Sequence, residues 1–348
     1  MKAVVKHSNQ PGDLSVKNIP LKDRSKDEVL VKINMASICG SDLHMYAGHS
    51  GYDWITYPLV LGHEMTGEVE DAEDASLIGR CVVINPYIPC GKCEHCLDGR
   101  ENQCDNGQFF SKKVAPASLN YGFRENGGMA EYIVVPNENI MLLPEKVPNE
   151  VAAISEALAV GLTAIEKVKD VQGKSFVVFG PGPIGLGIAS LLKGLGAGKI
   201  IMIGIPGDEK RLETAEQVGV DETVISDEAL TDQLLQLSNG YDVIFDCSGH
   251  HSVPNQAVKL LKKGGELVLV GISTQEFQLQ MDQIVRGEIS VYGSYGITRS
   301  TFNRVLEYAT DSAFPFNQLI SKVYSFEDAK EAFDFAQNQA NGKVILQF

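Results

Sequence analysis

The stretch that decides the fold is FVVFGPGPIGLGIASLLKG, which covers residues 176–194. Its apolar start predicts a buried strand over Phe176–Phe179, and the apolar spacing of Leu186–Leu195 predicts a helix. Between them lies GPGPIG at residues 180–185, which is a G-x-G-x-x-G pattern. A strand, this glycine turn and a helix in that order are the context in which the pattern binds a dinucleotide. The stretch therefore predicts a dinucleotide-binding βαβ unit.

Each glycine of this turn has a separate physical task. Gly180 allows the tight turn, Gly182 leaves room for the pyrophosphate, and Gly185 lets the helix pack closely on the strand. Backbone N–H groups at the start of the helix attract the phosphates, and Pro183, which has no N–H, and Ile184 occupy its first positions. We expect these residues to bind NAD or NADP. The alternative interpretation is a glycine-rich connection that binds no ligand.

The next predicted strand, Lys199–Ile205, lacks the acidic residue that usually binds the adenosine ribose about 20 residues after the turn. It ends in Gly204 and Ile205, and the basic residues Lys210 and Arg211 follow a few positions later. Without a carboxylate a 2′-phosphate is not repelled, and the two basic side chains could contact it. Alternatively, they only cover the start of a helix. The sequence thus predicts NAD or NADP binding, with a slight preference for a site that accepts NADP.

The rest of the chain indicates two domains. From residue 149 to residue 285, strand-like runs alternate with helical segments, which predicts a doubly wound parallel sheet of the α/β class. Residues 1–148 consist of short Val- and Ile-rich runs between turn residues, which predicts a β-rich domain. Residues 286–348 contain two helical segments and a closing strand, KVILQF, and we expect them to return to the first domain.

Composition excludes several classes of partner. The 348 residues carry a formal net charge of −15, which argues against nucleic acid or an anionic membrane surface as a partner. An anionic small substrate stays possible, because a local pocket can differ in charge from the whole chain. We find neither the apolar core of a signal peptide nor a run long enough to span a membrane. Together with the cysteine usage below, this favours a cytoplasmic location.

Four cysteines form the strongest local motif outside the glycine turn. Cys90, Cys93, Cys96 and Cys104 lie in PCGKCEHCLDGRENQC. Gaps of two residues let successive thiolates surround one tetrahedral ion, and four sulfurs leave no open position, which is typical of structural zinc. An iron–sulfur cluster is the alternative on spacing alone. A disulfide cluster is less favoured, because nothing else in the chain resembles a small secreted scaffold.

Three further residues, Cys39, His63 and Glu64, are of types that bind zinc. Taken singly, each has an ordinary explanation, because a lone cysteine is usually a core residue and a lone histidine is usually only hydrogen-bonded. Cys81 and Cys247 lie in apolar runs and are expected to behave as small buried apolar residues.

Taken together, the motifs resemble those of the zinc-dependent medium-chain dehydrogenases/reductases, near the sorbitol (polyol) and threonine dehydrogenase branches. The resemblance implies a GroES-like β-rich catalytic domain that holds both zinc ions and a Rossmann dinucleotide-binding domain. The matching motifs follow the family's order over nearly the whole chain: ICGSDLH at 38–44, GHEMTGEV at 62–69, the four-cysteine segment at 90–104, GGMAEYIVVP at 127–136, SEALAVGLTA at 155–164, GPGPIG at 180–185 and GKVIL at 342–346.

The resemblance also implies roles for individual residues. Cys39 and His63 would bind a catalytic zinc, with Glu64 as a ligand or a neighbour of a ligand. Glu156 stands where primary-alcohol members have a second cysteine, which indicates the polyol-type branch and a zinc contact that is direct or through water. Ser41 matches the hydroxyl beside the zinc, and His44 matches the outer end of a proton relay through the cofactor ribose.

The implied activity is hydride transfer between NAD(P) and a secondary alcohol of a polyol, sugar phosphate or sugar acid. Polyol members have a substrate-binding arginine that is missing here, since VYGSYGITRS reaches its arginine, Arg299, several residues late. This favours a substrate other than sorbitol. The alternatives are a threonine-type amino-alcohol dehydrogenase, a primary alcohol or aldehyde reductase and, more distantly, a non-enzymatic NADP-binding protein. By the same resemblance we expect a homodimer or homotetramer.

Overall fold

The computed structural model describes residues 1–104, 120–273 and 275–348. These residues form two compact units. Unit 1 consists of Met1–Ala157, Ile297–Thr310 and Ile320–Phe348, and unit 2 consists of Leu158–Gly296 and Asp311–Leu319. Each unit is described separately below.

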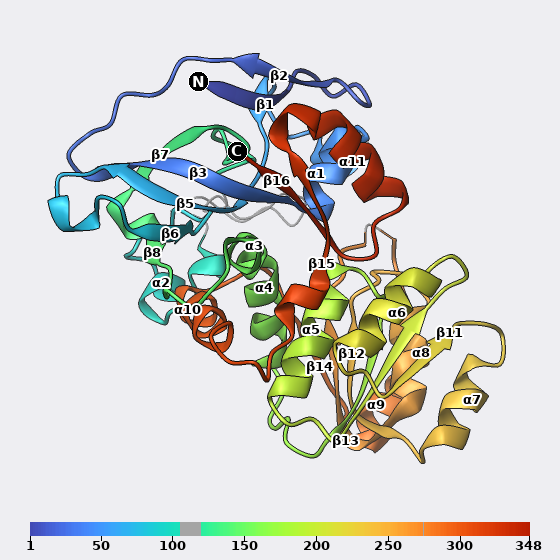
Figure 1. The fold of residues 1–348 in the computed structure, drawn as a ribbon. Helices are drawn as coiled ribbons and strands as arrows, with labels where there is room; N and C mark the ends of the chain where they lie inside the picture. The colour runs from blue at the N-terminus through green and yellow to red at the C-terminus, as the bar shows by residue number, and fades with distance from the viewer. Residues whose placement is uncertain (105–119, 274) are drawn as a thin grey trace. The chain divides into compact units, whose positions relative to one another are not determined.

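Unit 2 is built on one six-stranded parallel sheet (Figure 1). The sheet order is β11-β10-β9-β12-β13-β14. If β9 is counted as the first strand, this is the 3-2-1-4-5-6 order of a doubly wound dinucleotide-binding fold. The strands are β9 (Ser175–Phe179), β10 (Lys199–Gly204), β11 (Glu222–Ile225), β12 (Tyr241–Asp246), β13 (Leu261–Leu269) and β14 (Ser290–Gly293).

Helices of unit 2 cover this sheet with apolar side chains. Phe176 and Phe245 are fully buried, and their rings stack with centroids 6.2 Å apart on the neighbouring strands β9 and β12. The fully buried Tyr241 donates its hydroxyl to the Leu234 carbonyl at 2.7 Å. The helices are α5 (Pro183–Gly194), α6 (Glu209–Gln217), α7 (Leu230–Leu237), α8 (Val253–Leu260) and α9 (Met281–Gly287), and α4 (Ser155–Ile165) has residues in both units.

Unit 1 is rich in β-structure and contains two sheets. A three-stranded sheet has the order β2-β1-β4, and a larger sheet has the order β15-β16-β3-β5-β6-β8, with β7 also paired to β3. The strands are β1 (Lys2–Lys6), β2 (Leu14–Asn18), β3 (Glu28–Ile38), β4 (Leu59–Val60), β5 (Glu64–Asp71), β6 (Cys81–Ile84), β7 (Tyr132–Pro136), β8 (Ile140–Leu142), β15 (Ile320–Ser325) and β16 (Lys343–Gln347).

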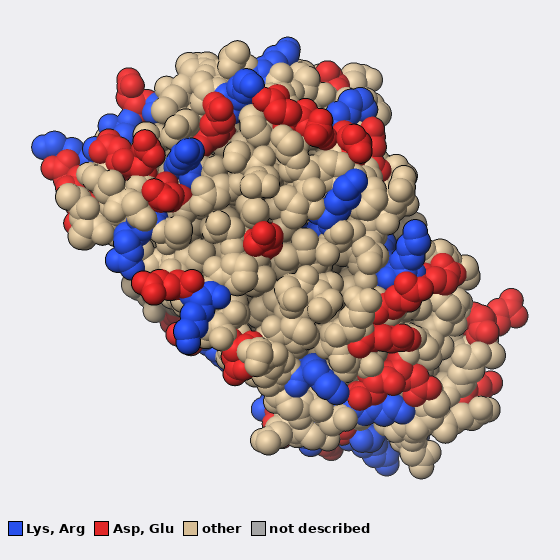
Figure 2. Space-filling model, viewed as in Figure 1, with Lys and Arg blue, Asp and Glu red and all other residues tan. Residues whose placement is uncertain are grey.

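The helices of unit 1 are short. They are α1 (Gly40–Tyr46), α2 (Glu94–Leu97), α3 (Asn149–Ala153), α10 (Arg299–Tyr308) and α11 (Ala329–Asn338). In the part of the chain that the structure describes, no helix combines the length and apolarity needed to cross a membrane. Figure 2 shows acidic and basic side chains interspersed over the face of the molecule that it presents.

The unit boundaries differ from the ranges expected from sequence. The first domain was expected to end at residue 148, but α3 packs against β3 and β5, so unit 1 continues to Ala157. Residues 286–348 were expected to return to the first domain as one block. In the structure β14 (Ser290–Gly293) pairs in parallel with β13, and unit 2 extends to Gly296.

The central strand of unit 1, β3, places chemically important residues side by side. Ser37, the second-last residue of β3, pairs with Glu64 at the start of β5. On the other side, Ile38 pairs with Val344, next to Lys343 at the start of β16. Because neighbouring strands lie about 4.8 Å apart, this register brings residues from the beginning, middle and end of unit 1 to one point.

The GGM segment of unit 1 needs glycine because two backbones meet there. The Gly127 N–H donates to the Val60 carbonyl at 2.8 Å, and the Gly128 N–H donates to the Gly62 carbonyl at 2.9 Å. A Cβ at Gly127 would lie 2.1 Å from the Gly62 oxygen, which is backbone and cannot rotate away. The close contact fixes the backbone directly before His63.

We therefore expect Gly127→Ala to destabilise unit 1. Forcing a methyl group into a packed contact costs about 1–3 kcal/mol, so the thermal unfolding midpoint should fall clearly. Gly51→Ala is the matched control, because a Cβ at Gly51 meets nothing within 4 Å. Equal midpoints for the two variants, measured by circular dichroism, would contradict this account of the contact.

Candidate active site and metal centres

The four sulfurs of the cysteine segment converge in unit 1. The sulfur atoms of Cys90, Cys93, Cys96 and Cys104 all lie within 4.8 Å of one another. Two of the separations are 3.5 Å for Cys93–Cys96 and 4.0 Å for Cys90–Cys96. A tetrahedral zinc with Zn–S bonds of about 2.3 Å sets its sulfurs about 3.8 Å apart. These separations fit a zinc ion held by four thiolates.

The backbone around these sulfurs is arranged to stabilise thiolates. The N–H of Cys90 donates to the sulfur of Cys104 at 3.2 Å, and the N–H of Cys93 donates to the sulfur of Cys90 at 3.3 Å. Backbone donors from Lys92 and Cys93 lower the pKa of the Cys90 thiol. A zinc ion needs its cysteine ligands deprotonated, so this backbone arrangement and the sulfur geometry support the same kind of site.

A second group of candidate ligands lies at the end of β3. Cys39 follows β3 and precedes α1, while Glu64 is the first residue of β5 and His63 directly precedes it. The Cys39 sulfur, an imidazole nitrogen of His63 and a carboxylate oxygen of Glu64 lie within 4.8 Å of one another. His63 and Glu64 are buried. One sulfur, one nitrogen and one oxygen ligand are a donor set that suits zinc and leaves a fourth position open.

Glu64 is fixed through only one of its two oxygens. Its Oε2 accepts a hydrogen bond from the Ser37 hydroxyl. The same oxygen forms an ion pair with the Lys343 ammonium, 2.5 Å away. Its Oε1 is buried and has no hydrogen-bond partner. A buried carboxylate oxygen without a partner is costly, and a metal ion bound beside Cys39 would supply the missing partner.

Lys343 is an unusual cation, because its side chain is only 3% exposed. Its ammonium also donates to the Ile38 carbonyl at 3.1 Å. Burial alone lowers the pKa of a lysine, but Glu64 and Cys39 outweigh this effect, and the pKa of Lys343 is raised. Lys343 therefore remains charged and neutralises Glu64. The motif GKVIL that contains Lys343 matches the family by sequence, but the motif alone predicts no role for the lysine.

Asp42 was also missed, and it lies directly behind His63. It is fully buried, and it accepts hydrogen bonds from the N–H of Cys39 at 2.9 Å and the N–H of Gly62 at 3.3 Å. Its Oδ1 is 3.8 Å from the Nδ1 of His63. Carboxylates in this position orient a metal-binding imidazole. The Nε2 of His63 is the nitrogen on the other side, 3.4 Å from the Ser41 hydroxyl.

Glu156 lies near this group without joining it. It stands in the first turn of α4 and is 6% exposed. Burial raises the pKa of Glu156 to about 7, with His63 opposing and Glu64 reinforcing the shift. Among the described residues, the three groups that lie within direct ligand distance of one another are Cys39, His63 and Glu64. A contact from Glu156 to a metal here would therefore need a water or a side-chain movement.

Helix α1 carries the two remaining residues of the predicted catalytic set. Ser41 lies beside His63, as described above. His44 is exposed, and its Nδ1 is 2.7 Å from the Nδ1 of His49, with its ring stacked on Tyr52. One of the two Nδ1 atoms must carry the hydrogen of that contact, so the pair can pass a proton toward solvent.

The glycine turn of unit 2 has the geometry that a dinucleotide needs. Gly180 has a φ of +94°, and a Cβ at Gly185 would lie 2.1 Å from the Gly180 oxygen. Gly182 precedes α5 with open space around it, and Pro183 and Ile184 form the first helical positions. The helix N-terminus is thus accessible to a phosphate.

The end of β10 contains an acid that the sequence analysis did not place there. Asp208 follows the strand by several residues, yet a Cβ at Gly204 would lie 3.1 Å from the Asp208 Cβ. The Asp208 carboxylate accepts from the Ile205 N–H at 3.1 Å and pairs with Arg211 at 3.2 Å. Lys210 is exposed. A carboxylate therefore does stand next to Gly204, because the turn after β10 folds back.

The cysteine group yields a direct test. If it holds zinc, Cys93→Ser should remove about one zinc ion per chain and lower the unfolding temperature. Cys81→Ser is the matched control, because Cys81 is a free cysteine outside both groups. Zinc is measured by atomic emission on purified protein. A Cys93→Ser protein with the zinc content and stability of the control would overturn the assignment.

Comparison with known proteins agrees with both units. Residues 25–145 match the family model of the alcohol dehydrogenase GroES-like domain, and residues 183–311 match that of the zinc-binding dehydrogenases. Sorbitol dehydrogenase of Bacillus subtilis is 30% identical over 344 residues, covering 97% of this chain and 93% of the relative. L-idonate 5-dehydrogenase (NAD(P)(+)) of Escherichia coli is 33% identical over 329 residues, covering 94% and 93%.

A solved structure extends the likeness to three dimensions. Galactitol-1-phosphate dehydrogenase from Escherichia coli superimposes with a TM-score of 0.87 at 29% identity, covering 100% of both chains. The sequence expectation of a GroES-like domain and a Rossmann domain is confirmed. With nearly full coverage by relatives at 30% identity or more, the chain belongs to the zinc-dependent medium-chain dehydrogenases, a family of NAD(P)-linked oxidoreductases.

Proposed function

We propose that this chain transfers a hydride between NAD(P) and a secondary alcohol of a polyol, a sugar phosphate or a sugar acid. The observation that carries the proposal is the group of Cys39, His63 and Glu64, which presents three zinc-binding atoms beside the Ser41 hydroxyl. The relatives named above act on substrates of these three kinds, which supports the same class here.

In this proposal each residue has a defined task. A zinc ion held by Cys39 and His63, with Glu64 as ligand or neighbour, would act as a Lewis acid that lowers the pKa of the substrate hydroxyl. Ser41 would accept the hydroxyl proton, and His44 would be the outer end of a relay that includes the ribose of a bound cofactor. The contact of His44 with His49 supports the last step, because both rings are exposed to water. Asp42, whose Oδ1 lies 3.8 Å from the Nδ1 of His63, would orient the imidazole through its negative charge.

The dinucleotide is assigned to the turn between β9 and α5. The glycines bind the pyrophosphate through backbone N–H groups, and Gly204, Lys210 and Arg211 lie where the adenosine ribose would bind. Asp208 changes the balance between the cofactors. Because its carboxylate stands beside Gly204 and pairs with Arg211, we now infer that NAD binds at least as well as NADP, contrary to the slight NADP preference drawn from sequence.

We also propose a homodimer or homotetramer that works in the reducing cytoplasm. Among the described residues, β14 is the outermost strand on its side of the unit 2 sheet, and exposed apolar side chains lie on it and on the preceding helix α9, including Met281, Val285 and Val291. All seven cysteines are free thiols, as zinc binding requires. Light scattering that gives a monomer mass would contradict the oligomer.

The decisive experiment is a turnover screen with both cofactors. Purified zinc-loaded protein is given sorbitol, L-idonate, galactitol 1-phosphate, L-threonine and a primary alcohol, and reduction of NAD or NADP is followed by absorbance. Turnover confined to the first three substrates supports the proposal. Preference for L-threonine would establish an amino-alcohol dehydrogenase. Preference for the primary alcohol would establish a primary alcohol or aldehyde reductase.

Glu156 tests the branch assignment. Glu156→Gln keeps the size of the side chain but removes its charge, so turnover should fall by about 10- to 100-fold, as is common when a metal loses such a partner. Zinc retention should weaken, while dinucleotide affinity, set in unit 2, should stay near normal. Glu145→Gln, an exposed carboxylate, is the control. If Glu156→Gln keeps full turnover and zinc, Glu156 is only a helix residue.

Asp208 tests the cofactor inference. Asp208→Asn keeps the shape of the turn but removes the charge that opposes a 2′-phosphate, and it frees Arg211 from its ion pair. The ratio of kcat/KM for NADP to that for NAD should rise by about tenfold or more. Glu209→Gln makes the same charge change one residue away on an exposed side chain. The inference fails if the two variants have equal cofactor ratios.

A further inference from the structure

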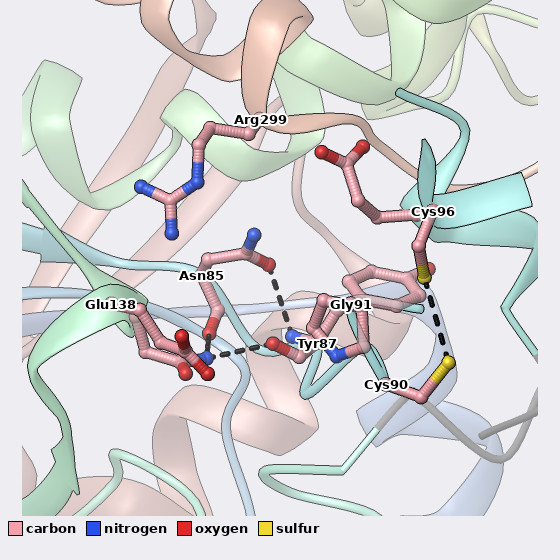
Figure 3. Close-up of a pocket in the computed structure, with 10 residues that line it drawn as sticks. Asn85, Tyr87, Cys90, Gly91, Cys96, Glu138 and Arg299 are labelled. Atoms are coloured by element: carbon pink, nitrogen blue, oxygen red, sulfur yellow. Dashed lines mark hydrogen bonds between the residues drawn. The ribbon is translucent and has the colours of Figure 1, made fainter. Parts of the chain in front are cut away.

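A pocket in unit 1 lies away from the residues assigned to hydride transfer. It has a volume of about 340 Å³, and it is lined by the cysteine segment on one side and by Asn85, Glu138, Asn139 and Arg299 on the other (Figure 3). None of the described residues that line it belongs to the group around Cys39.

Arg299 is the cation of this pocket. It is the first residue of α10, and Figure 3 shows its side chain extending from that helix toward Asn85. It is partly buried, and among the described residues it makes no hydrogen bond within 3.5 Å and no ion pair within 4.0 Å. The N-terminus of a helix carries partial positive charge, so a cation gains nothing from its own helix there. Its guanidinium is therefore available to water or to an anionic ligand in the pocket.

Residues with hydrogen-bond acceptors also line the pocket. Asn139 is only 2% exposed, and its Nδ2 donates to the carbonyls of Asn85 and Tyr87, both at 2.7 Å. These two bonds use its donors and fix the amide, so its Oδ1 remains as a buried acceptor without a partner. The Oε2 of Glu101 is a second buried acceptor without a partner, and the Glu138 carboxylate lies at the exposed rim.

The charges select one ligand chemistry. Two carboxylates and one guanidinium give the lining an excess of negative charge, which disfavours phosphate or sulfate. A neutral sugar would satisfy the acceptors but leave Arg299 without an anion. A molecule with a carboxylate for Arg299 and an ammonium group for the exposed Glu138 satisfies both charged sides with charge-assisted hydrogen bonds, and the Glu101 carboxylate adds negative charge that favours the ammonium.

We propose that this pocket binds a small zwitterion that carries an ammonium group and a carboxylate, as an α-amino acid does. The site is separate from hydride transfer, so the proposal stands independently of which alcohol the enzyme oxidises. Because Cys90, Gly91 and Cys96 also line the pocket, the ligand would contact the segment that holds the structural zinc.

The test uses three probes of similar size on the zinc-loaded full chain. L-serine has both groups, ethanolamine lacks the carboxylate, and glycerate has a hydroxyl in place of the ammonium. We expect isothermal titration calorimetry to give binding of L-serine in the millimolar range or tighter, with weaker binding of the other two. Arg299→Met should weaken L-serine binding about 10- to 100-fold, as the loss of a charged hydrogen-bond partner does.

Two further variants make the result unambiguous. Glu138→Gln, at the exposed rim, should weaken L-serine binding but not glycerate binding, and it serves if Arg299→Met fails to fold. Arg80→Met, at an exposed arginine outside the pocket, should bind like the unmodified chain. The proposal is overturned by no L-serine binding, by glycerate binding equally well, or by L-serine binding that both pocket variants retain, since the last result would place the amino acid at the catalytic metal.

Discussion

The buried ion pair between Lys343 and Glu64 is the contact on which the metal-binding region of unit 1 depends. Their side chains are 3% and 0% exposed, and the nitrogen and oxygen lie 2.5 Å apart. Neither charge could be buried alone without a large desolvation cost. Glu64 belongs to an early strand and Lys343 to the last one, so the charge of Glu64 is balanced only after β16 has paired with β3. The site therefore depends on a residue near the C-terminus, Lys343, and on the register in which β16 and β5 pair with β3.

One lysine does not balance the acids gathered around it. Cys39, Asp42, Glu64 and Glu156 all lie close enough to affect one another's ionisation, and burial raises the pKa of Cys39, Asp42 and Glu156. Burial thus disfavours the charged forms of Cys39, Asp42 and Glu156, and a further cation would favour them. A divalent metal ion supplies the missing positive charge and a partner for the buried Oε1 of Glu64. Metal binding and the stability of unit 1 are thus linked, because the same carboxylates take part in both.

The sequence predicted best where the chemistry is local. The geometry of the glycine turn and of the cysteine group depends on residues close together in the sequence. The order of the motifs predicted the family. Three features escaped it because they depend on distance across the fold. Lys343 reaches Glu64 through strand register, and Asp208 reaches Gly204 through a turn that folds back. The third is β14 (Ser290–Gly293), whose place in the unit 2 sheet depends on its pairing with β13. A single sequence lists such residues without showing which of them meet.

The C-terminal segment holds the catalytic region at a second point as well. Tyr46, near the end of α1, donates to Asp334 of α11 at 2.7 Å and accepts from Lys330 at 3.0 Å. Helix α1 also carries Ser41 and His44. The strand β16 follows α11 directly, so one continuous segment contacts the helix that carries Ser41 and also neutralises Glu64. The position of Ser41 relative to Cys39, His63 and Glu64 is therefore set by packing of regular elements, which is more precise than a loop can provide.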